Sequence, residues 1–135
     1  MGPFPHNAPH AVIGAENPAG TDGFEFVEFA HPNPDELRAL FTRMGYTLTA
    51  RHKRKAIELW QQGDITYVLN DEAGSHARTF VEEHGPCAPS MCWRVVDAAH
   101  AFAHAVSLGA TPFEGPEKTL DLPAIVGIGG SLIYF

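Results

Sequence analysis

The sequence predicts an α+β fold in which two βαβββ modules join their strands into one curved mixed sheet. An apolar strand at Phe24–Ala30 is followed by an amphipathic helix and short strands, and the same order restarts at Ser90–Val96. The two copies are offset by 67 residues, counted from Phe24 to Met91, and share little residue identity. This offset is too long for a solenoid repeat, so it indicates a pseudo-twofold single domain with a ligand-sized cleft between its halves.

The first helix has clear start and stop signals. Asn33 is the expected N-cap, with Pro34 at the first helical position and Glu36 at the spacing of a capping box. Gly45 is expected to end the helix in the left-handed conformation. We expect one apolar stripe to face the core, formed by Leu37, Leu40, Phe41 and Met44.

Two further helices are predicted. One repeats the plan of the first helix, with Asp97 as its expected cap and Gly109 as its end. A shorter one over Ser75–Glu83 should link the two halves. The residues expected to face the body of the domain are Ala98, Ala101, Phe102, Ala105 and Leu108 on the former, and Ala77, Phe80 and Val81 on the linking helix.

Short alternating runs predict the remaining strands. A connection containing Gly63 predicts a hairpin in the first half, whereas prolines make the strands of the second half short or edge-like. Gly127–Gly130 leads into a strand and not into a helix, so it predicts a tight turn rather than a phosphate loop. The expected strands are 46–50, 56–61 and 65–70 in the first half, and 111–114, 119–122 and 131–135 in the second.

These elements divide the chain into a flexible leader over residues 1–22 and a single domain over 23–135. The leader is rich in Pro, Ala, Gly and Asn and shows no periodicity. Within the domain, module one covers about 23–71, the linker helix about 75–84, and module two about 90–135.

Composition predicts a globular protein that binds neither nucleic acid nor membranes. The formal net charge is −7, from nine Lys and Arg against sixteen Asp and Glu. The basic run Arg51–Lys55 is expected to be a solvated turn. No apolar run approaches the ~20 residues that span a bilayer, and the start does not read as a secretory signal. Cys87 and Cys92 fit a reducing compartment, so we expect a cytoplasmic protein without a disulfide between them.

Few residues are placed for chemistry. His100 and His104 have the i, i+4 spacing that can hold a metal, but they lie opposite the apolar face of their helix and should face water. Glu25 and Glu28 point to opposite sides of the first strand, so they cannot cooperate as a carboxylate pair. One of the two should point inward, where it could serve as an acidic ligand or a base, but we favour a carboxylate that is hydrogen-bonded to a neighbouring strand or wetted at the cleft. Four other histidines are expected to cap elements or face solvent: His31, His52, His76 and His84.

Several blocks of the chain together resemble the amino-terminal domain of the bacterial type of 4-hydroxyphenylpyruvate dioxygenase. The blocks are GFEFVEFAHPNPDELRALFTRMGY, QGDITYVLN, EEHGP, WRVVDA, AHAVSLGA and LPAIVGIGGSLIYF, in this order and spacing. The resemblance covers about residues 17–135. That family has the vicinal-oxygen-chelate (glyoxalase-like) fold, which is built from paired βαβββ modules and agrees with the repeat.

The resemblance implies an Fe(II)-dependent enzyme whose catalytic centre lies outside this chain. The family converts 4-hydroxyphenylpyruvate and O2 to homogentisate and CO2 in tyrosine breakdown, with iron held by two His and one Glu of the carboxy-terminal domain. In this fold, metal ligands come from the first, fifth and eighth strands, where this chain offers Glu25, Ser90–Trp93 and Leu132–Phe135. Only Glu25 can ligate iron. We therefore expect no catalytic, cofactor-binding or metal-binding residue here, and no activity from the chain alone.

The role that the resemblance implies is structural. The domain should pack against the carboxy-terminal catalytic domain and form a homodimer or a higher homo-oligomer. The apolar run Ser131–Phe135 is interpreted as a strand of a domain cut from the longer enzyme.

Two other hypotheses stay open. One is a free-standing vicinal-oxygen-chelate protein whose cleft binds a small aromatic ligand. The other is the matching domain of hydroxymandelate synthase, which shares substrate, iron and domain plan with the dioxygenase. The aromatic residues that would line a cleft are Phe24, Phe26, Trp60, Tyr67 and Trp93.

Overall fold

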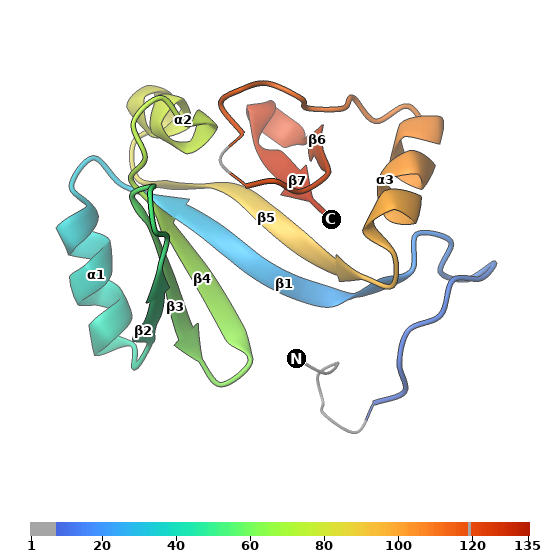
Figure 1. Cartoon of the computed structure of the whole chain (residues 1–135), viewed down its shortest axis with the longest axis horizontal. Coiled ribbons are helices and arrows are strands. Elements are labelled where there is room, and N and C mark those ends of the chain that lie inside the picture. The colour runs from blue at the N-terminus through green and yellow to red at the C-terminus, as the bar shows by residue number, and fades with distance from the viewer. Residues whose placement is uncertain (1–7, 119) are drawn as a thin grey trace.

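One curved sheet organises the part of the chain that the computed structural model describes, residues 8–118 and 120–135 (Figure 1). Its seven strands follow the order β2-β3-β4-β1-β5-β7-β6. No helix in these ranges is long and apolar enough to cross a membrane. The elements are β1 (Thr21–Ala30), α1 (Pro34–Arg43), β2 (Thr47–Arg51), β3 (Ile57–Gln62), β4 (Ile65–Asn70), α2 (His76–His84), β5 (Cys87–Val95), α3 (Ala98–Ser107), β6 (Ala124–Val126), the 3-10 turn η1 (Ile128–Gly130) and β7 (Leu132–Tyr134).

The two modules meet where β1 and β5 run antiparallel at the centre of the sheet. Val27 lies opposite Met91, and each central strand pairs in parallel with the last strand of its own module, β1 with β4 and β5 with β7. The predicted α+β fold with a curved mixed sheet is confirmed. The offset between corresponding elements varies: it is 64 residues from the start of α1 at Pro34 to that of α3 at Ala98, and the predicted 67 from the start of β4 at Ile65 to that of β7 at Leu132.

The first module builds its core between α1 and one face of the sheet. Phe41, Tyr46, Trp60 and Leu69 form a buried cluster. The Tyr46 ring stacks on Tyr67 with the ring centroids 4.3 Å apart. Because aromatic side chains bury large apolar areas, this cluster is the main attachment of α1 to the strands.

Helix α1 begins and ends where the sequence predicted, but the predicted capping box is wrong. Pro34 is the first helical residue, and Gly45 has a φ of 89°, which a residue with a side chain rarely adopts. The Asn33 side chain makes no cap bond and donates from Nδ2 to the Glu36 carboxylate at 3.3 Å. A carboxylate is the stronger acceptor for that amide, so the amide oxygen is turned away from the backbone N–H groups.

The apolar stripe predicted on α1 is partly wrong. Phe41 is 2% exposed and Leu37 packs against the same cluster, whereas Leu40 is 39% exposed and Met44 46% exposed. Arg38 lies on the sheet side of the helix, because its guanidinium reaches a buried carboxylate on β3. The buried face of α1 therefore runs through positions 37, 38 and 41. It includes the charged Arg38, which lies outside the predicted apolar stripe.

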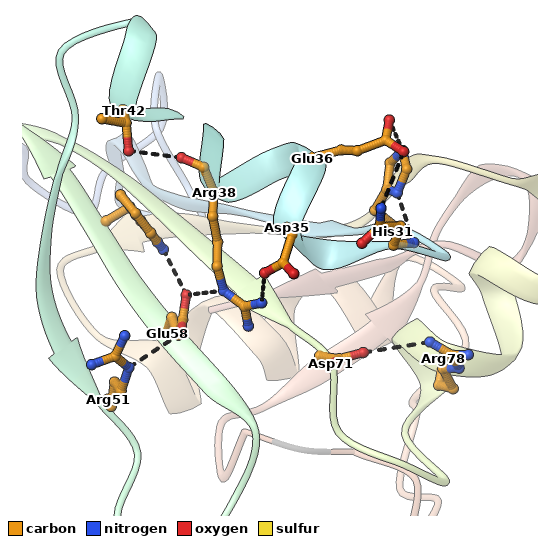
Figure 2. A network of polar contacts seen from close by, with 11 residues as sticks. His31, Asp35, Glu36, Arg38, Thr42, Arg51, Glu58, Asp71 and Arg78 are labelled. Carbon is orange, nitrogen blue, oxygen red and sulfur yellow. Dashed lines mark hydrogen bonds and ion pairs between the residues drawn. The ribbon is translucent and has the colours of Figure 1, made fainter. Parts of the chain in front are cut away.

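That buried carboxylate belongs to Glu58, which joins α1 to two strands (Figure 2). It accepts hydrogen bonds from Arg38 Nε at 3.1 Å, Arg51 Nε at 3.2 Å and Trp60 Nε1 at 3.1 Å. Burial raises the pKa of Glu58, but the bonds from Arg38, Trp60 and Arg51 outweigh it, so the net pKa is lowered. Asp35 adds a second carboxylate to Arg38 at 2.7 Å.

The linking helix α2 and the helix α3 both have side-chain caps at their N-termini. The side chain of Ser75 caps α2, and Ala77 and Val81 are buried as predicted. Asp97 caps α3 by accepting from the backbone N–H of His100 at 2.9 Å. Ala101 is fully buried. Leu108 is 75% exposed, so its predicted inward position is wrong; it is the C-cap residue, where the helical periodicity ends.

The small strands of the second module lie later in the chain than predicted. The expected strand 111–114 is only a bridge between Pro112 and Ile125. Of the expected strand 119–122, Thr119 lies outside the described residues and 120–122 are not a strand. The strand in this place is β6, after Pro123, and β7 then matches the expected 131–135. Proline lacks the N–H that a ladder requires, which explains why pairing begins only after the last proline.

Part of the predicted leader packs on the domain. Pro18 accepts a hydrogen bond from His100 Nε2 at 2.8 Å, and the carbonyl of Gly20 accepts from the N–H of Val96 at 2.8 Å. Asn17 accepts from the N–H of Thr21 at 2.9 Å. Residues 1–7 of the leader lie outside the described ranges.

We predict that Phe41→Ala lowers the free energy of unfolding by about 3–5 kcal/mol, because it empties the centre of the α1 cluster. Leu40→Ala, on the next ridge of the same helix, should cost less than about 1 kcal/mol. Urea denaturation followed by tryptophan fluorescence measures both. A cost above 2 kcal/mol for Leu40→Ala would contradict the observed rotation of α1.

Candidate functional site

A buried carboxylate lies on the face of the sheet opposite α1, at the junction of the modules. Phe29 on β1 packs against Phe41 of α1, so its neighbour Glu28 points to the other face. Glu28 is 1% exposed and lies opposite Ser90 on β5. One of the two glutamates of β1 was expected to point inward, and it is Glu28.

Glu28 is held from both sides by neighbouring strands. Asn70 on β4 donates from Nδ2 to Glu28 Oε1 at 2.6 Å. Ser90 on β5 donates from Oγ to Glu28 Oε2. The interpretation of this carboxylate as one bonded to adjacent strands is therefore confirmed. Together, Glu28, Asn70 and Ser90 form the interior polar site.

Burial dominates the electrostatics of the interior polar site. It raises the pKa of Glu28, and the bonds from Ser90 and Asn70 and the nearby His76 only partly oppose it. Burial also raises the pKa of Cys92 to about 12 and raises the pKa of Tyr134. These thiol and phenol groups are therefore neutral near pH 7, and they provide neither a nucleophile nor a base.

In the second module, apolar side chains cover the sheet face on which Glu28 lies. Cys92, Leu132 and Tyr134 are buried there together with Ala124. The chain segment after α3 crosses over them and contributes Phe113, Leu120 and Leu122. His76, at the start of α2, holds this segment in place, because its backbone N–H donates to the carbonyl of Glu117 at 3.0 Å. Its ring Nε2 donates to the carbonyl of Gly130, on η1, at 2.8 Å.

The donor set of the interior polar site does not fit an Fe(II) centre. Iron of the facial-triad type takes two imidazoles and one carboxylate. The site offers one carboxylate, one amide and one hydroxyl, and the carboxylate is already bound by the other two groups. Among residues 8–118 and 120–135, no three His, Cys, Asp or Glu side chains lie close enough to share a metal ion.

The structure places Glu25, the candidate ligand on the first strand, at the surface. Glu25 is 42% exposed in its side chain and lies 4.0 Å from Arg94 at the surface. Glu28 occupies the interior position instead. Bulges between Phe24 and Phe26 and between Glu28 and Ala30 shift the register of β1 against β5, and no local pattern reveals where such bulges fall.

The histidines act structurally. The rings of His100 and His104 are parallel, with centroids 6.3 Å apart, and His100 is already bonded to a backbone carbonyl. His31 Nδ1 accepts from the N–H of Asn33 at 2.9 Å, and His52 Nδ1 accepts from two backbone N–H groups. The predicted capping role is confirmed for these two. Both cysteines are free, as expected.

The five aromatic residues proposed for a cleft do not share one. Phe24, Phe26 and Tyr67 border a hollow of about 300 Å³ near the β3–β4 turn. Trp60 is 6% exposed beneath α1, and Trp93 stacks on Phe24 with ring centroids 4.4 Å apart. Simple packing accounts for most of the set.

Paired βαβββ modules joined through their first strands define the vicinal-oxygen-chelate fold, and similar solved structures share it. The family model for the amino-terminal domain of hydroxyphenylpyruvate dioxygenase (HPPD) matches residues 15–135. The chain belongs to this family. The resemblance predicted over residues 17–135 is thereby confirmed.

Similar proteins and solved structures agree with this family assignment. The chain is 46% identical over 129 residues to a 4-hydroxyphenylpyruvate dioxygenase of Pseudomonas aeruginosa, covering 92% of this chain and 36% of that protein. A solved xylose isomerase-like TIM barrel/4-hydroxyphenylpyruvate dioxygenase fusion protein superposes with a TM-score of 0.79 at 32% identity, covering 94% of this chain and 20% of that one. A mutant 4-hydroxymandelate synthase from Streptomyces coelicolor superposes with a TM-score of 0.69 at 17% identity, over 84% of this chain and 36% of that one, and shares the fold.

The chain therefore spans about a third of the length of the curated relatives that it matches, 36% for the Pseudomonas aeruginosa dioxygenase. The remainder of those proteins corresponds to a carboxy-terminal partner domain.

We predict that Glu28→Gln stabilises the chain increasingly as pH rises. The folded-state pKa of Glu28 is raised, so its contribution to stability is complete below the unfolded-state pKa and is lost as pH rises through the folded-state pKa. Glutamine retains an acceptor for Asn70 and a donor for Ser90 without a charge. The gain at pH 8 should be about 1–3 kcal/mol, the size of one polar desolvation.

Urea denaturation at pH 5 and pH 8 measures this gain. Glu25→Gln is the matched control, because it removes the same charge from the same strand at an exposed position, and it should show a difference below about 0.5 kcal/mol at both pH values. A loss of stability in Glu28→Gln at pH 8 would contradict the assignment of a costly buried charge.

Proposed function

We propose that the chain is the non-catalytic amino-terminal domain of an Fe(II)-dependent 4-hydroxyphenylpyruvate dioxygenase. The family match over residues 15–135 carries this proposal, together with the coverage of only 36% of the Pseudomonas aeruginosa relative. The whole enzyme would convert 4-hydroxyphenylpyruvate and O2 to homogentisate and CO2. Its iron would be bound in the carboxy-terminal domain, because the interior polar site here offers the wrong donors.

An exposed apolar surface is consistent with a structural role, in which the domain packs against the carboxy-terminal domain. Ile128 on the η1 turn is 96% exposed. It borders a hollow of about 260 Å³, whose lining is mostly apolar side chains of the two central strands and β7. We call this surface the apolar hollow, and it is lined by Val27, Ala88, Ser90, Met91, Ile128, Ser131, Leu132 and Ile133. Exposed apolar surfaces of this kind mark protein contacts, so this one is the proposed seat of the carboxy-terminal domain.

We also propose a cytoplasmic location and a homo-oligomeric enzyme. The free thiols of Cys87 and Cys92 support a reducing compartment. The apolar hollow supports self-association, since a copy of the chain can cover it when the second domain is absent. The domain division at about residue 23, with modules at 23–71 and 90–135, stays part of the proposal.

A specific observation supports one alternative function. The hollow of about 300 Å³ bordered by Phe24, Phe26 and Tyr67 could hold a small aromatic ligand in a free-standing binding protein. The hydroxymandelate synthase alternative rests on the fold alone, because that identity is 17%. The DNA sequence downstream of the codon for Phe135 separates the first alternative from the proposal. A reading frame that continues into a domain with two ligating His and one Glu supports the dioxygenase, and a stop codon contradicts it.

We predict that the purified chain binds no stoichiometric iron and consumes no O2 with 4-hydroxyphenylpyruvate and added Fe(II). The interior carboxylate would have to lose its bonds to Asn70 and Ser90, and within the described residues it is not part of any group of three His, Cys, Asp or Glu side chains that could share a metal ion. Elemental analysis after dialysis and an oxygen electrode measure these quantities. One tightly held iron per chain, or any homogentisate, would overturn the proposal.

We predict that the isolated chain forms a symmetric dimer through the apolar hollow. Light scattering over a dilution series should show the dimer, and Ile128→Glu should convert it to a monomer by burying a charge at the contact. Ile65→Glu is the control, because Ile65 is also exposed, at 54%, but lies outside that hollow. A wild-type monomer at high concentration would contradict the prediction.

A further inference from the structure

A third hollow, about 350 Å³ in volume, lies between the β2–β3 loop and the segment that follows α3. We call it the basic hollow. It is lined by His52, Arg54, Lys55, Lys118, Leu120 and Asp121. It shares no lining residue with the apolar hollow, and no member of the interior polar site reaches it.

The basic hollow concentrates positive charge on an acidic protein. The chain has nine Lys and Arg and a formal charge of −7. Three of the nine line this one hollow: Arg54, Lys55 and Lys118. Four arginines elsewhere are paired with carboxylates: Arg38, Arg51, Arg78 and Arg94. Within residues 8–118 and 120–135, no carboxylate forms an ion pair with Arg54 or Lys118, so their charges remain available to a ligand.

The β2–β3 side of the hollow is fixed in place by hydrogen bonds. His52 Nδ1 accepts from the backbone N–H of Arg54 at 3.1 Å and of Lys55 at 3.0 Å. The Glu72 carboxylate accepts from the N–H of Ala56 at 2.6 Å. A ligand would therefore not need to order this loop, which lowers the entropic cost of binding.

The opposite side is fixed separately. The carbonyl of Glu117 accepts from the N–H of His76 at 3.0 Å, and the N–H of Lys118 donates to the carbonyl of Gly115 at 3.1 Å. Lys118 is thereby held opposite a loop that precedes it by more than sixty residues. The sequence favoured a solvated turn for Arg51–Lys55 because this distant cation was not visible in the local pattern.

We propose that the basic hollow binds a small dianion that carries phosphate or carboxylate groups. The lining has three formal positive charges and one formal negative charge, from Asp121. A dianion balances this charge. The Arg54 guanidinium can bind two oxygens side by side, and Lys118 supplies a single donor. Leu120 provides apolar contact for a short carbon skeleton.

Isothermal titration calorimetry of the full chain at low ionic strength and pH 7 tests this proposal, with inorganic phosphate and succinate as the two probes. Each probe that binds should saturate at one site per chain. Arg54→Ala and Lys118→Ala should each weaken binding by about tenfold, the loss of one charge-assisted hydrogen bond. Phosphate and succinate test the two classes of anionic group separately.

Arg43→Ala is the matched control, because it removes one positive charge from the exposed end of α1, away from this hollow. It should change affinity by less than about twofold. If Lys118→Ala does not fold, Lys118→Gln replaces it. No saturable binding of either probe up to about 10 mM would overturn the proposal, as would equal losses in Arg43→Ala and Arg54→Ala.

Discussion

The antiparallel pairing of β1 with β5 is the constraint on which the rest of this domain depends. It is the seam that joins the two modules, and it sets the order of every other strand, because β4 and β7 each extend the sheet from one of these two strands. It also brings Glu28 opposite Ser90, residues 62 positions apart in the chain. Without this seam neither module could bury its inner face, since each has only half of a sheet.

The interior polar site shows that this fold can enclose a polar cluster at the junction of its two modules. Here a single carboxylate is bonded to an amide and a hydroxyl, so it is satisfied by hydrogen bonds without a cation. The raised pKa of Glu28 indicates that the arrangement costs stability, because the charged form is taken out of water.

Two surfaces of different chemistry suit two different kinds of partner. The apolar hollow follows the central strands and includes the exposed Ile128, which favours a large protein surface that excludes water. The basic hollow is charged and is bordered by two hydrogen-bonded loops, which favours a small anion. They share no lining residue, so changes in one can be made without altering the other.

The sequence by itself determined the features that depend on near neighbours. The two-module order, the cap at Asp97, the glycine end of α1 and the β3–β4 hairpin follow from local signals and lie where they were predicted. The family resemblance likewise came from contiguous blocks of residues.

Tertiary structure alone decided the features that depend on distant partners. Arg38 faces the sheet because Glu58 lies beneath it, and this displaces Leu40 from the core. The packing of Phe29 against Phe41 of α1 places Glu28 rather than Glu25 inside. Lys118 reaches the basic hollow only because the segment after α3 folds back across the sheet. Register and long-range charge pairing arise when the chain closes on itself, so no stretch of sequence contains them.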